Sequence, residues 1–268
     1  MKPSLVVIRG GGDLATGVAQ KFFRSGFSVI ILETAAPSAI RRTVCLCEAA
    51  YAGEAAVEGM ACKKAAGVKE ALDTAGQGEI IPLLVDPAGS SISALRPAAV
   101  IDAIMAKKNT GTNRGMAAVT IALGPGFTAG VDVDIVIETM RGHDLGRLVL
   151  KGAAQADTGI PAEVGGRGSQ RVIYTRAAGT LRHLKKIGDR VQEGEPLFSV
   201  EGDLYTAPFA GVLRGLLREG AAAKGAKAAD VDPRLDTDVF SISDKARSVG
   251  GAALEAYFFQ TRKNGGVV

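Results

Sequence analysis

The chain has 268 residues, of which 47% are hydrophobic and 22% charged, and its formal net charge is +4. This length predicts two domains, or one domain with a substantial appendage, and the composition is that of an ordinary globular protein. Aromatic residues make up only 5% of the chain and Trp is absent. This argues against a nucleic-acid-binding protein in which bases stack on exposed aromatic side chains. No apolar run reaches the roughly 18 residues of a membrane-spanning helix, and the N-terminus lacks a secretory signal. We therefore expect a cytoplasmic protein with neither nucleic acid nor membrane as a partner.

A short apolar strand and a glycine-rich loop open the chain. Residues 5–8 predict a strand and residues 14–24 a helix. Between them, Gly10, Gly12 and Ala15 fit the spacing G-x-G-x-x-[GA], in which glycine permits a tight turn and a close approach of a pyrophosphate. Backbone N–H groups at the helix start then face the anion. The candidate cofactor-binding residues of this loop are Gly10, Gly11, Gly12, Asp13, Leu14 and Ala15.

An acidic residue follows the second predicted strand, residues 28–32. Glu33 stands 21 residues after Gly12, where a carboxylate accepts a hydrogen bond from a ribose 2′-hydroxyl and favours NAD over NADP. Asp13, by contrast, either caps the helix or repels a phosphate, which argues against a plain dehydrogenase. The alternative is a tight turn between strand and helix that holds no ligand.

The next segments continue the alternation of strands and helices. Cys45 and Cys47 would lie on one face of a strand, as ordinary buried residues rather than a metal or redox pair, and the odd count with Cys62 favours a reducing compartment. Residues 61–74 have helical periodicity, and residues 80–85 and 98–101 predict strands. This alternation is typical of a parallel sheet.

Polar residues follow the predicted strands. Asp86 follows one strand, and Asp102, Lys107 and Asn109 follow the next. Ligands of a parallel sheet bind beyond the carboxyl ends of its strands, so these side chains are candidates for the same crevice as the glycine-rich loop. The lysines can equally be solvated.

A denser polar cluster follows residue 116, where the sequence changes to strands with glycine turns. Gly124 and Gly126 form a turn that could approach a ligand, and Glu138, Arg141 and His143 lie close together in sequence. Such a set suits general acid–base chemistry or anion binding, but equally a salt-bridged turn. The candidate catalytic residues are His143, Glu138, Arg141 and Lys107, and no metal-ligand spacing accompanies them.

A repeat occupies the C-terminal third. The stretches IGDRVQEGEPLFSVEGD and REGAAAKGAKAADVDPR share two turn glycines and a returning strand, a pattern typical of a barrel-sandwich hybrid, the biotinyl/lipoyl-like fold. The joining hairpin SVEGDLYTAP has no Lys, so we expect no biotin or lipoate attachment but a docking element. The final helix has Ser243 as its N-cap and is weakened in its middle by Gly250 and Gly251.

The expected fold class is α/β, with an N-terminal Rossmann-like parallel sheet followed by a β-rich part that contains the barrel-sandwich hybrid module. The expected domains are a nucleotide-binding domain at 1–115, a connecting segment at 116–165, the hybrid module at 166–235, and a terminal helix and tail at 236–268.

Several motifs together carry a family resemblance. The segments are IRGGGDLATGVA, DAIMAKKNTGT, ALGPGFTAGVDVDIVIETMRGHDLGR, IPAEVGG, GDRVQEGEPLF, APFAGVL and DVDPR. With them the chain resembles a bacterial family, the selenium-dependent molybdenum hydroxylase system proteins of the YqeB type. The resemblance implies an accessory role in the maturation of a client molybdenum hydroxylase and assigns no catalytic residue.

Three functions remain open at this point. The first is a maturation factor that binds a small phosphate-bearing ligand, either NAD or another nucleotide, or a molybdopterin dinucleotide. The second is an NAD-dependent oxidoreductase that uses Glu33 for the ribose and His143 or Lys107 near the reacting carbon. The third is a non-catalytic scaffold with a vestigial nucleotide site. The sequence leaves the oligomeric state open.

Overall fold

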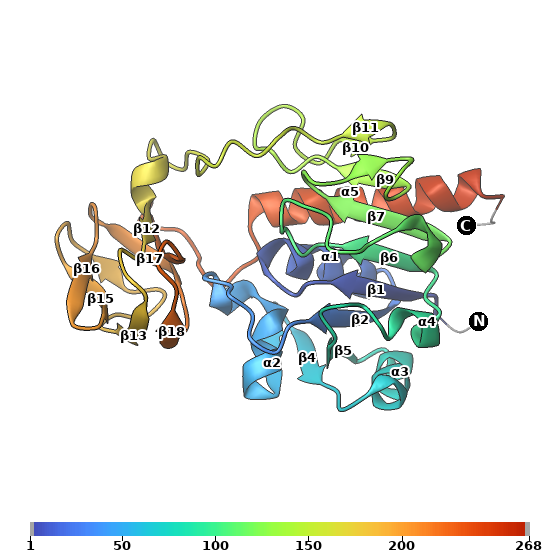
Figure 1. The fold of residues 1–268 in the computed structure, drawn as a ribbon, viewed down its shortest axis with the longest axis horizontal. Helices are drawn as coiled ribbons and strands as arrows, with labels where there is room; N and C mark the ends of the chain where they lie inside the picture. Colours follow the sequence, from blue (N-terminus) through green and yellow to red (C-terminus); the bar gives the residue numbers. More distant parts are fainter. Residues whose placement is uncertain (1–2, 266–268) are drawn as a thin grey trace. The chain divides into compact units, whose positions relative to one another are not determined.

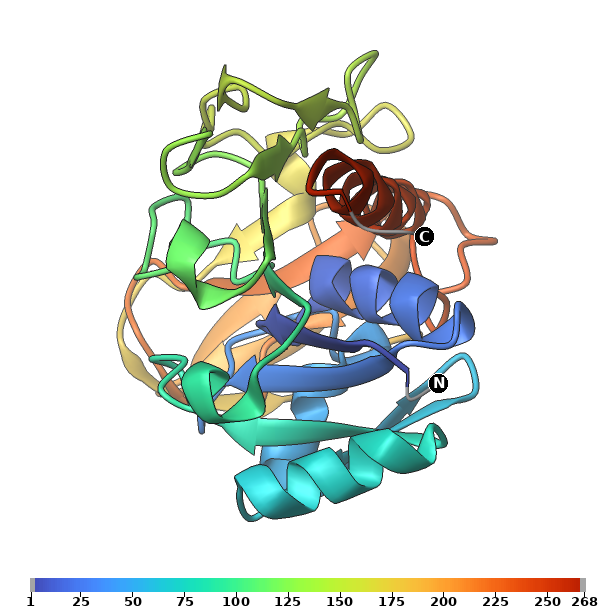
Figure 2. The same ribbon diagram turned by 90° about the vertical axis from the view of Figure 1, so that its right-hand side faces the viewer.

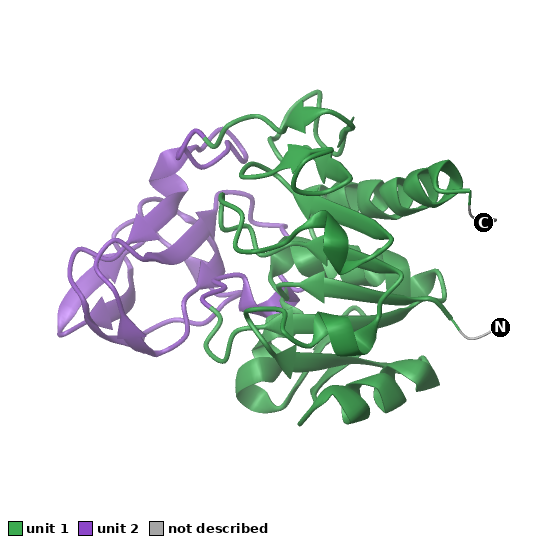
Figure 3. Cartoon of the chain, turned by 45° about the vertical axis from the view of Figure 1, so that its right-hand side comes forward, with its two compact units in different colours: residues 1–37, 45–157, 242–268 green, residues 38–44, 158–241 purple. Residues whose placement is uncertain are grey.

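The computed structural model describes residues 3–265 and divides into two compact units, which Figure 3 colours separately. Unit 1 consists of Met1–Pro37, Cys45–Asp157 and Ile242–Val268, and unit 2 of Ser38–Val44 and Thr158–Ser241. The sequence-based division into four segments stays a prediction about domains, but three strands of the 116–165 segment, β7, β9 and β10, belong to the main sheet of unit 1.

Unit 1 is built on a nine-stranded sheet in the order β10-β9-β7-β6-β1-β2-β5-β4-β3 (Figure 1). Every pair of neighbouring strands from β9 to β4 in this order is parallel. The two edge strands are antiparallel to their neighbours, β10 to β9 and β3 to β4. Their bounds are β1 Leu5–Arg9, β2 Ser28–Glu33, β3 Glu54–Val57, β4 Met60–Lys64, β5 Ile80–Val85, β6 Ala99–Asp102, β7 Val119–Leu123, β9 Ile135–Ile137 and β10 Leu148–Val149. A separate pair joins β8 (Thr128–Ala129) to β11 (Gly152–Ala153).

This architecture corrects the expected fold class. The sheet is mixed rather than parallel, and the chain continues it with strands that the sequence left unassigned between two domains. Residues 61–74 also do not form one helix, because β4 takes Met60–Lys64 and a helix begins only at Val68. Small and apolar residues of β4 fit a strand beside β5 as well as they fit a helix, so the local pattern could not separate the two.

Helices cover both faces of the sheet. Strand residues such as Val7, Ile30 and Leu32 pack with Ala71 and Ala75 of α3. Figure 2 shows α1 and α5 side by side, with α3 on the other side of the strands. The helices are α1 Asp13–Arg24, α2 Ala49–Ala52, α3 Val68–Gln77, α4 Ile92–Leu95 and α5 Asp244–Lys263; the 3-10 helices are η1 Arg42–Val44, η2 Leu46–Glu48, η3 Arg114–Met116 and η4 Ser169–Arg171.

Helix α5 begins at its expected cap, since the Ser243 side chain accepts a hydrogen bond from the Ala246 N–H. It crosses α1 where both helices carry glycine. A Cβ at Gly17 would lie 2.4 Å from the Ala246 carbonyl oxygen, and a Cβ at Gly250 would lie 2.4 Å from the Gly17 carbonyl oxygen. The two backbones therefore touch because both positions lack a side chain.

The turn between β3 and β4 holds the start of α5 through Glu58. Its carboxylate accepts hydrogen bonds from the Ile242 N–H at 2.8 Å, from Gln20 at 2.7 Å and from Arg247 at 2.6 Å. Burial by itself raises the pKa of Glu58, but these hydrogen bonds and the Arg247 charge outweigh it and hold the pKa below the ordinary 4.5. The ionised form of Glu58 is thus the one that stabilises unit 1.

A Glu58→Gln variant is expected to be about 1–2 kcal/mol less stable than the wild type at pH 7, since it loses hydrogen bonds to a charged acceptor. Because the pKa of Glu58 is lowered in the folded state, this contribution is full above the unfolded pKa and is lost as the pH falls through the folded pKa. Urea denaturation at pH 7 and pH 3 measures the difference. A gap between variant and wild type that does not shrink at pH 3 would contradict the role of the charge.

Unit 2 consists of two four-stranded antiparallel sheets, ordered β12-β19-β17-β14 and β16-β15-β13-β18. Their bounds are β12 Val172–Tyr174, β13 Gly179–His183, β14 Arg190–Val191, β15 Pro196–Val200, β16 Asp203–Thr206, β17 Gly211–Leu216, β18 Gly220–Ala222 and β19 Lys227–Asp232. Buried side chains from both sheets, Leu181, Phe198 and Leu213 among them, form one apolar core. The expected biotinyl/lipoyl-like module is therefore replaced by this pair of antiparallel sheets.

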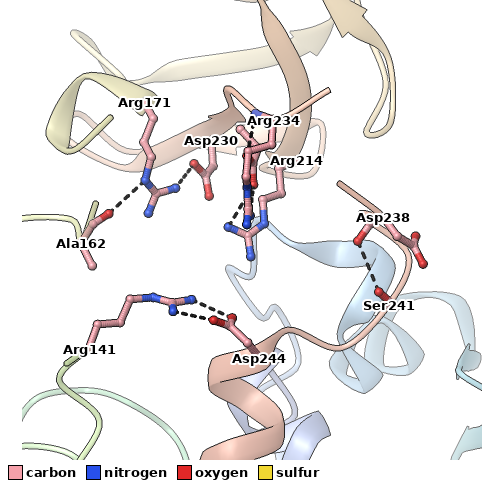
Figure 4. A network of polar contacts seen from close by, with 10 residues as sticks. Arg141, Ala162, Arg171, Arg214, Asp230, Arg234, Asp238, Ser241 and Asp244 are labelled. Atoms are coloured by element: carbon pink, nitrogen blue, oxygen red, sulfur yellow. Dashed lines mark hydrogen bonds and ion pairs between the residues drawn. The ribbon is translucent and has the colours of Figure 1, made fainter. Parts of the chain in front are cut away.

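A network of arginines and aspartates lies within unit 2, in which Arg171, Asp230 and Asp232 are buried and Arg234 is exposed (Figure 4). Arg171 pairs with Asp230, and its Nε donates to the Ala162 carbonyl at 3.2 Å. Arg234 forms a two-pronged pair with Asp232 at 3.0 and 2.8 Å. Asp230 and Asp232 are two residues apart on β19 and so share one face of that strand.

Candidate functional site

The three consecutive glycines of the N-terminal loop have different structural roles. Gly10 has a φ of +96°, and a Cβ there would lie 2.9 Å from the Ala103 carbonyl oxygen. At Gly11 a Cβ would lie 3.0 Å from the backbone nitrogen of Cys47, which donates a 2.8 Å hydrogen bond to the Gly11 carbonyl. A Cβ at Gly12 would have nothing within 4 Å. Close packing inside the protein therefore explains why positions 10 and 11 are glycine. Of the three positions, only Gly12 has open space where a side chain would lie.

Glu33 reaches back to this loop from the end of β2. One carboxylate oxygen accepts from the Gly11 N–H at 2.8 Å, and the other accepts from the Thr34 N–H at 2.7 Å. The acid predicted to stand beside the loop is therefore in contact with it. The helix start beyond the loop is less open to an anion, because Asp13 occupies the first turn of α1. Leu14 is half-buried and Ala15 is buried on the same helix.

A Gly12→Ser variant tests whether the backbone at Gly12 faces open space. Gly12 is the N-cap of α1 at a φ of −72°, no side chain caps the helix there, and serine is a preferred N-cap residue. We expect its unfolding free energy to stay within about 0.5 kcal/mol of the wild type or to rise. Gly10→Ala, the matched control, is expected to lose at least about 2 kcal/mol because its Cβ meets backbone. Thermal unfolding of both variants measures this, and equal losses would contradict the assignment of open space at Gly12.

A cavity of about 210 Å³ opens beside the loop, at the carboxyl ends of β1, β2 and β5. It is lined by Arg9, Gly10, Leu32, Glu33, Thr34, Asp86, Pro87, Ile104 and Thr110. Gly10 and Glu33 are thus the sequence-predicted candidates that the cavity brings together. Asp86, noted in the sequence for its place after a strand, also lines it.

The fully buried Arg9 was missed by sequence reasoning. Its NH1 donates to the Thr112 hydroxyl at 2.5 Å and lies 3.8 Å from Asp102, and its NH2 donates to the Pro87 carbonyl at 3.0 Å. The available signal was a charged residue at the end of the apolar run LVVI. Buried charges are rare unless they are paired or functional, so this position stands out once the strand is known.

Asp102 lies behind the cavity as a partner of Arg9 rather than as a lining residue. Burial raises the pKa of Asp102, and hydrogen bonds from the Thr112 hydroxyl and the Ile104 N–H, together with the Arg9 charge, oppose that rise. Thr112 therefore connects the two charged groups. The arrangement holds the Arg9 side chain in one place at the cavity wall.

The other candidates after β6 organise their own loop. Asn109 accepts from the Gly111 N–H at 2.8 Å and donates to the Thr112 carbonyl at 2.9 Å. Lys107 forms a 2.6 Å ion pair with Asp157, and both side chains are partly exposed. The residues that line the cavity include neither Lys107 nor Asn109.

Gly124 and Gly126 also serve packing. A Cβ at Gly124 would lie 2.5 Å from the Thr139 hydroxyl, and one at Gly126, where φ is +105°, would lie 2.6 Å from the backbone nitrogen of Lys108. At this turn the glycines are thus approached closely by other residues of the same chain.

The cluster of candidate catalytic residues is dispersed in the structure. Glu138 is buried and accepts from the Met140 and Gln155 N–H groups at 2.6 and 2.7 Å. Arg141 forms a two-pronged pair with Asp244 at 2.8 and 3.0 Å, drawn in Figure 4, while His143 is exposed. Glu138 and Arg141 thus bind other parts of the chain, and the catalytic roles of these residues stay a prediction.

The three cysteines are buried and form no disulfide. Cys45 and Cys47 do not lie on a strand, since Cys45 precedes η2 and Cys47 lies within it. Burial raises the pKa of Cys62 to about 12, with a further contribution from Cys47. At that pKa the thiol stays protonated at neutral pH, so Cys62 is an unreactive core residue.

Comparison with known proteins gives one close sequence relative. No family model matches the chain. A curated protein of Escherichia coli strain K12, described as the uncharacterized protein YqeB, is 48% identical over 264 residues, which cover 96% of this chain. The chain is thus similar to YqeB along nearly its whole length. It spans only 49% of the length of YqeB itself.

Solved structures give a weaker likeness. The ectoine utilization protein EutE (DoeB) from Ruegeria pomeroyi is 10% identical, with 85% of each chain covered and a TM-score of 0.27. An aspartoacylase family protein from Mesorhizobium loti is 11% identical, with 86% and 85% covered and a TM-score of 0.27. A succinylglutamate desuccinylase from Silicibacter sp. TM1040 is 12% identical, with 85% and 84% covered and a TM-score of 0.27. Scores this low assign neither a fold nor a function to the chain.

These comparisons also correct the expected classification. YqeB is described only as uncharacterized, and the solved structures are described as ectoine-utilization, aspartoacylase-family and desuccinylase proteins. The description of YqeB names no molybdenum accessory protein, so what is shown is similarity to YqeB alone, and the mixed main sheet corrects the expected Rossmann-type parallel sheet. Within residues 3–265, no helix has the length and apolar character needed to cross a membrane, and no group of three or more His, Cys, Asp or Glu side chains is placed to hold a metal ion.

Proposed function

We propose that the chain binds a small cofactor-like ligand in the cavity beside the glycine-rich loop. The observation that supports this is the cavity itself, which combines Gly10 and Glu33 with a buried arginine at the carboxyl ends of neighbouring strands. Open sheets hold ligands in this position, where the strands of the two halves diverge on either side of β1. The proposal concerns binding, because the candidate acid–base residues are engaged elsewhere or exposed.

The ligand's hydroxyl or amino groups donate to Glu33 in this proposal. Its two carboxylate oxygens accept one backbone hydrogen bond each, and a carboxylate has acceptor capacity for more. If the ligand is NAD, another nucleotide or a molybdopterin dinucleotide, its phosphates extend toward Gly12, where the backbone is open. The contacts of Lys107 and the exposure of His143 leave no observation that favours the alternative of hydride transfer.

The accessory role in a selenium-dependent molybdenum hydroxylase system rests on the sequence resemblance alone and stays a prediction, as do a client hydroxylase and a cytoplasmic location. The scaffold with a vestigial site is the outcome that remains if no ligand binds.

Thermal unfolding of the full chain with NAD, NADP, ATP and a molybdopterin dinucleotide tests the binding proposal. A ligand at 100 times its dissociation constant should raise the unfolding free energy by about 2.7 kcal/mol. Glu33→Ala should abolish that ligand-induced increase, whereas Glu54→Ala, an exposed glutamate of β3 away from the cavity, should keep it. If no ligand in the panel stabilises the wild type, or if Glu33→Ala retains the full increase, the proposal fails.

A further inference from the structure

One segment of the chain, residues 104–110, supplies two parts of the cavity wall. Its first and last residues, Ile104 and Thr110, both line the cavity. The segment is anchored at both ends to one buried carboxylate, because the Ile104 N–H donates to Asp102 at 3.2 Å and the Thr112 hydroxyl donates to the other Asp102 oxygen at 2.5 Å. Its middle is exposed and has no regular secondary structure. We call residues 104–110 the strap.

Two residues of the strap have an unusual backbone conformation. Within residues 3–265, five residues other than glycine have a positive φ. Glu58 and Glu201 lie in the tight turns of hairpins, and Arg96 is the C-cap of α4. Met105 and Lys107, with φ of +61° and +60°, lie in neither a hairpin nor a helix end. A left-handed conformation costs free energy in any residue with a Cβ, and such strain is common in segments that move or bind ligands.

Few contacts offset this cost and hold the strap in place. Its backbone rests on the glycine turn after β7, where a Cβ at Gly126 would lie 2.6 Å from the Lys108 nitrogen. Lys107 forms its ion pair with Asp157, but both side chains are partly exposed, so the pair contributes little. Residues 106–110 are exposed and include no large apolar side chain. Segments with so few buried contacts are among the first to open locally.

We propose that the strap opens to admit a ligand to the cavity and closes over it. The strained backbone at Met105 and Lys107 raises the free energy of the closed strap, so opening requires only a local change. A ligand in the cavity touches Ile104 and Thr110, and therefore favours the closed strap. This inference rests on the proposed function, since it states how the ligand of the same cavity enters and is retained.

Limited digestion of the full chain with trypsin, read by mass spectrometry, tests the strain. Trypsin cleaves after lysine, and at low protease concentration the rate follows the population of the open strap. Lys107→Gly and Lys107→Ala both remove the ion pair and leave Lys108 as the cleavage site, so they differ only in the Cβ at a φ of +60°. Cleavage after Lys108 is expected to be about fivefold slower in Lys107→Gly, because only glycine adopts this conformation without cost.

The neighbouring lysine provides the matched control. Lys108 lies outside the left-handed region, so Lys108→Gly should be cleaved after Lys107 faster than Lys108→Ala, since glycine there only adds freedom to the open strap. Each rate is divided by that of a synthetic peptide of residues 100–116 with the same replacement, which removes the preference of trypsin itself. Equal rates for the two replacements of Lys107, or the same order at both positions, overturn the inference.

A second site in the same digest separates opening of the strap from unfolding of unit 1. Lys63 lies in β4, inside the main sheet, and its cleavage requires that sheet to open. Wild-type chain is expected to be cleaved in the strap at least about tenfold faster than after Lys63. Equal rates at the two sites overturn the inference, because the strap would then open only when unit 1 unfolds.

The ligand panel of NAD, NADP, ATP and a molybdopterin dinucleotide connects the strap to the cavity. A ligand that raises the unfolding free energy of the wild type should slow cleavage after Lys107 and Lys108 at least about tenfold at 100 times its dissociation constant. If such a ligand leaves cleavage of the strap unchanged, the inference fails while the proposed function stands. If no ligand in the panel stabilises the chain, both fail.

Discussion

Replacing Gly250 with alanine should destabilise the protein by about 3 kcal/mol, although alanine is the better helix former. The added Cβ would lie 2.4 Å from the carbonyl oxygen of Gly17, a fixed backbone atom of α1. Relief of that overlap requires the two helices to move apart. The edge-to-face contacts of Tyr257 with Phe22 and Phe27, at 5.9 and 5.0 Å, lie at the same interface and would be disturbed.

The adjacent glycine provides a matched control. Gly251 lies in the same helix, and a Cβ there would have nothing within 4 Å. Gly251→Ala should therefore stabilise the protein by about 0.5–1 kcal/mol, because only the helix propensity changes. Urea denaturation of both variants gives the two free energies. Changes of the same sign in the two variants would contradict a direct backbone contact between α1 and α5.

The second large effect is expected at the buried partner of Arg9. Asp102→Ala should cost about 3–5 kcal/mol, because it leaves the fully buried guanidinium without its carboxylate. The Thr112 hydroxyl also loses its acceptor at 2.5 Å. Guanidinium chloride denaturation at pH 7 measures the loss.

An exposed ion pair in the same region serves as the control. Asp157→Ala breaks the 2.6 Å ion pair with Lys107. The side chain of Asp157 is 37% exposed and that of Lys107 is 56% exposed. Exposed pairs contribute at most about 1 kcal/mol, so this variant should stay close to the wild type. If Asp102→Ala lost no more stability than Asp157→Ala, the buried pair would not be holding Arg9 at the cavity wall.

Local sequence patterns predicted some contacts of the site and missed others for a physical reason. The spacing from Gly12 to Glu33 placed an acid beside the glycine-rich loop, and Glu33 does accept from the Gly11 N–H. The contact between Arg9 and Thr112 joins residues 103 apart, and no local period encodes it. A strand end near a loop can be read from periodicity, whereas the partner of a buried charge depends on which strands become neighbours.

The glycines illustrate the same limit. Gly250 and Gly251 are indistinguishable by helix propensity, yet one meets the backbone of α1 and the other meets open space. Gly10, Gly124 and Gly126, candidates for the close approach of a ligand, are instead positions where the chain approaches itself. The prediction of the fold class was wrong for a related reason. Short strands such as β9 and β10 have too few residues to show to which sheet they belong.

The most direct test of ligand binding in the cavity is a two-dimensional amide NMR titration of the labelled full chain with NAD, NADP, ATP and a molybdopterin dinucleotide in turn. The N–H groups of Gly10, Gly11 and Thr34 lie at or beside the cavity, and their signals should shift together and saturate, while those of β13 and β15 in unit 2 stay unchanged. Shifts confined to unit 2, or no saturable shift of these three amides with any of the four ligands at millimolar concentration, would contradict a ligand site beside the glycine-rich loop.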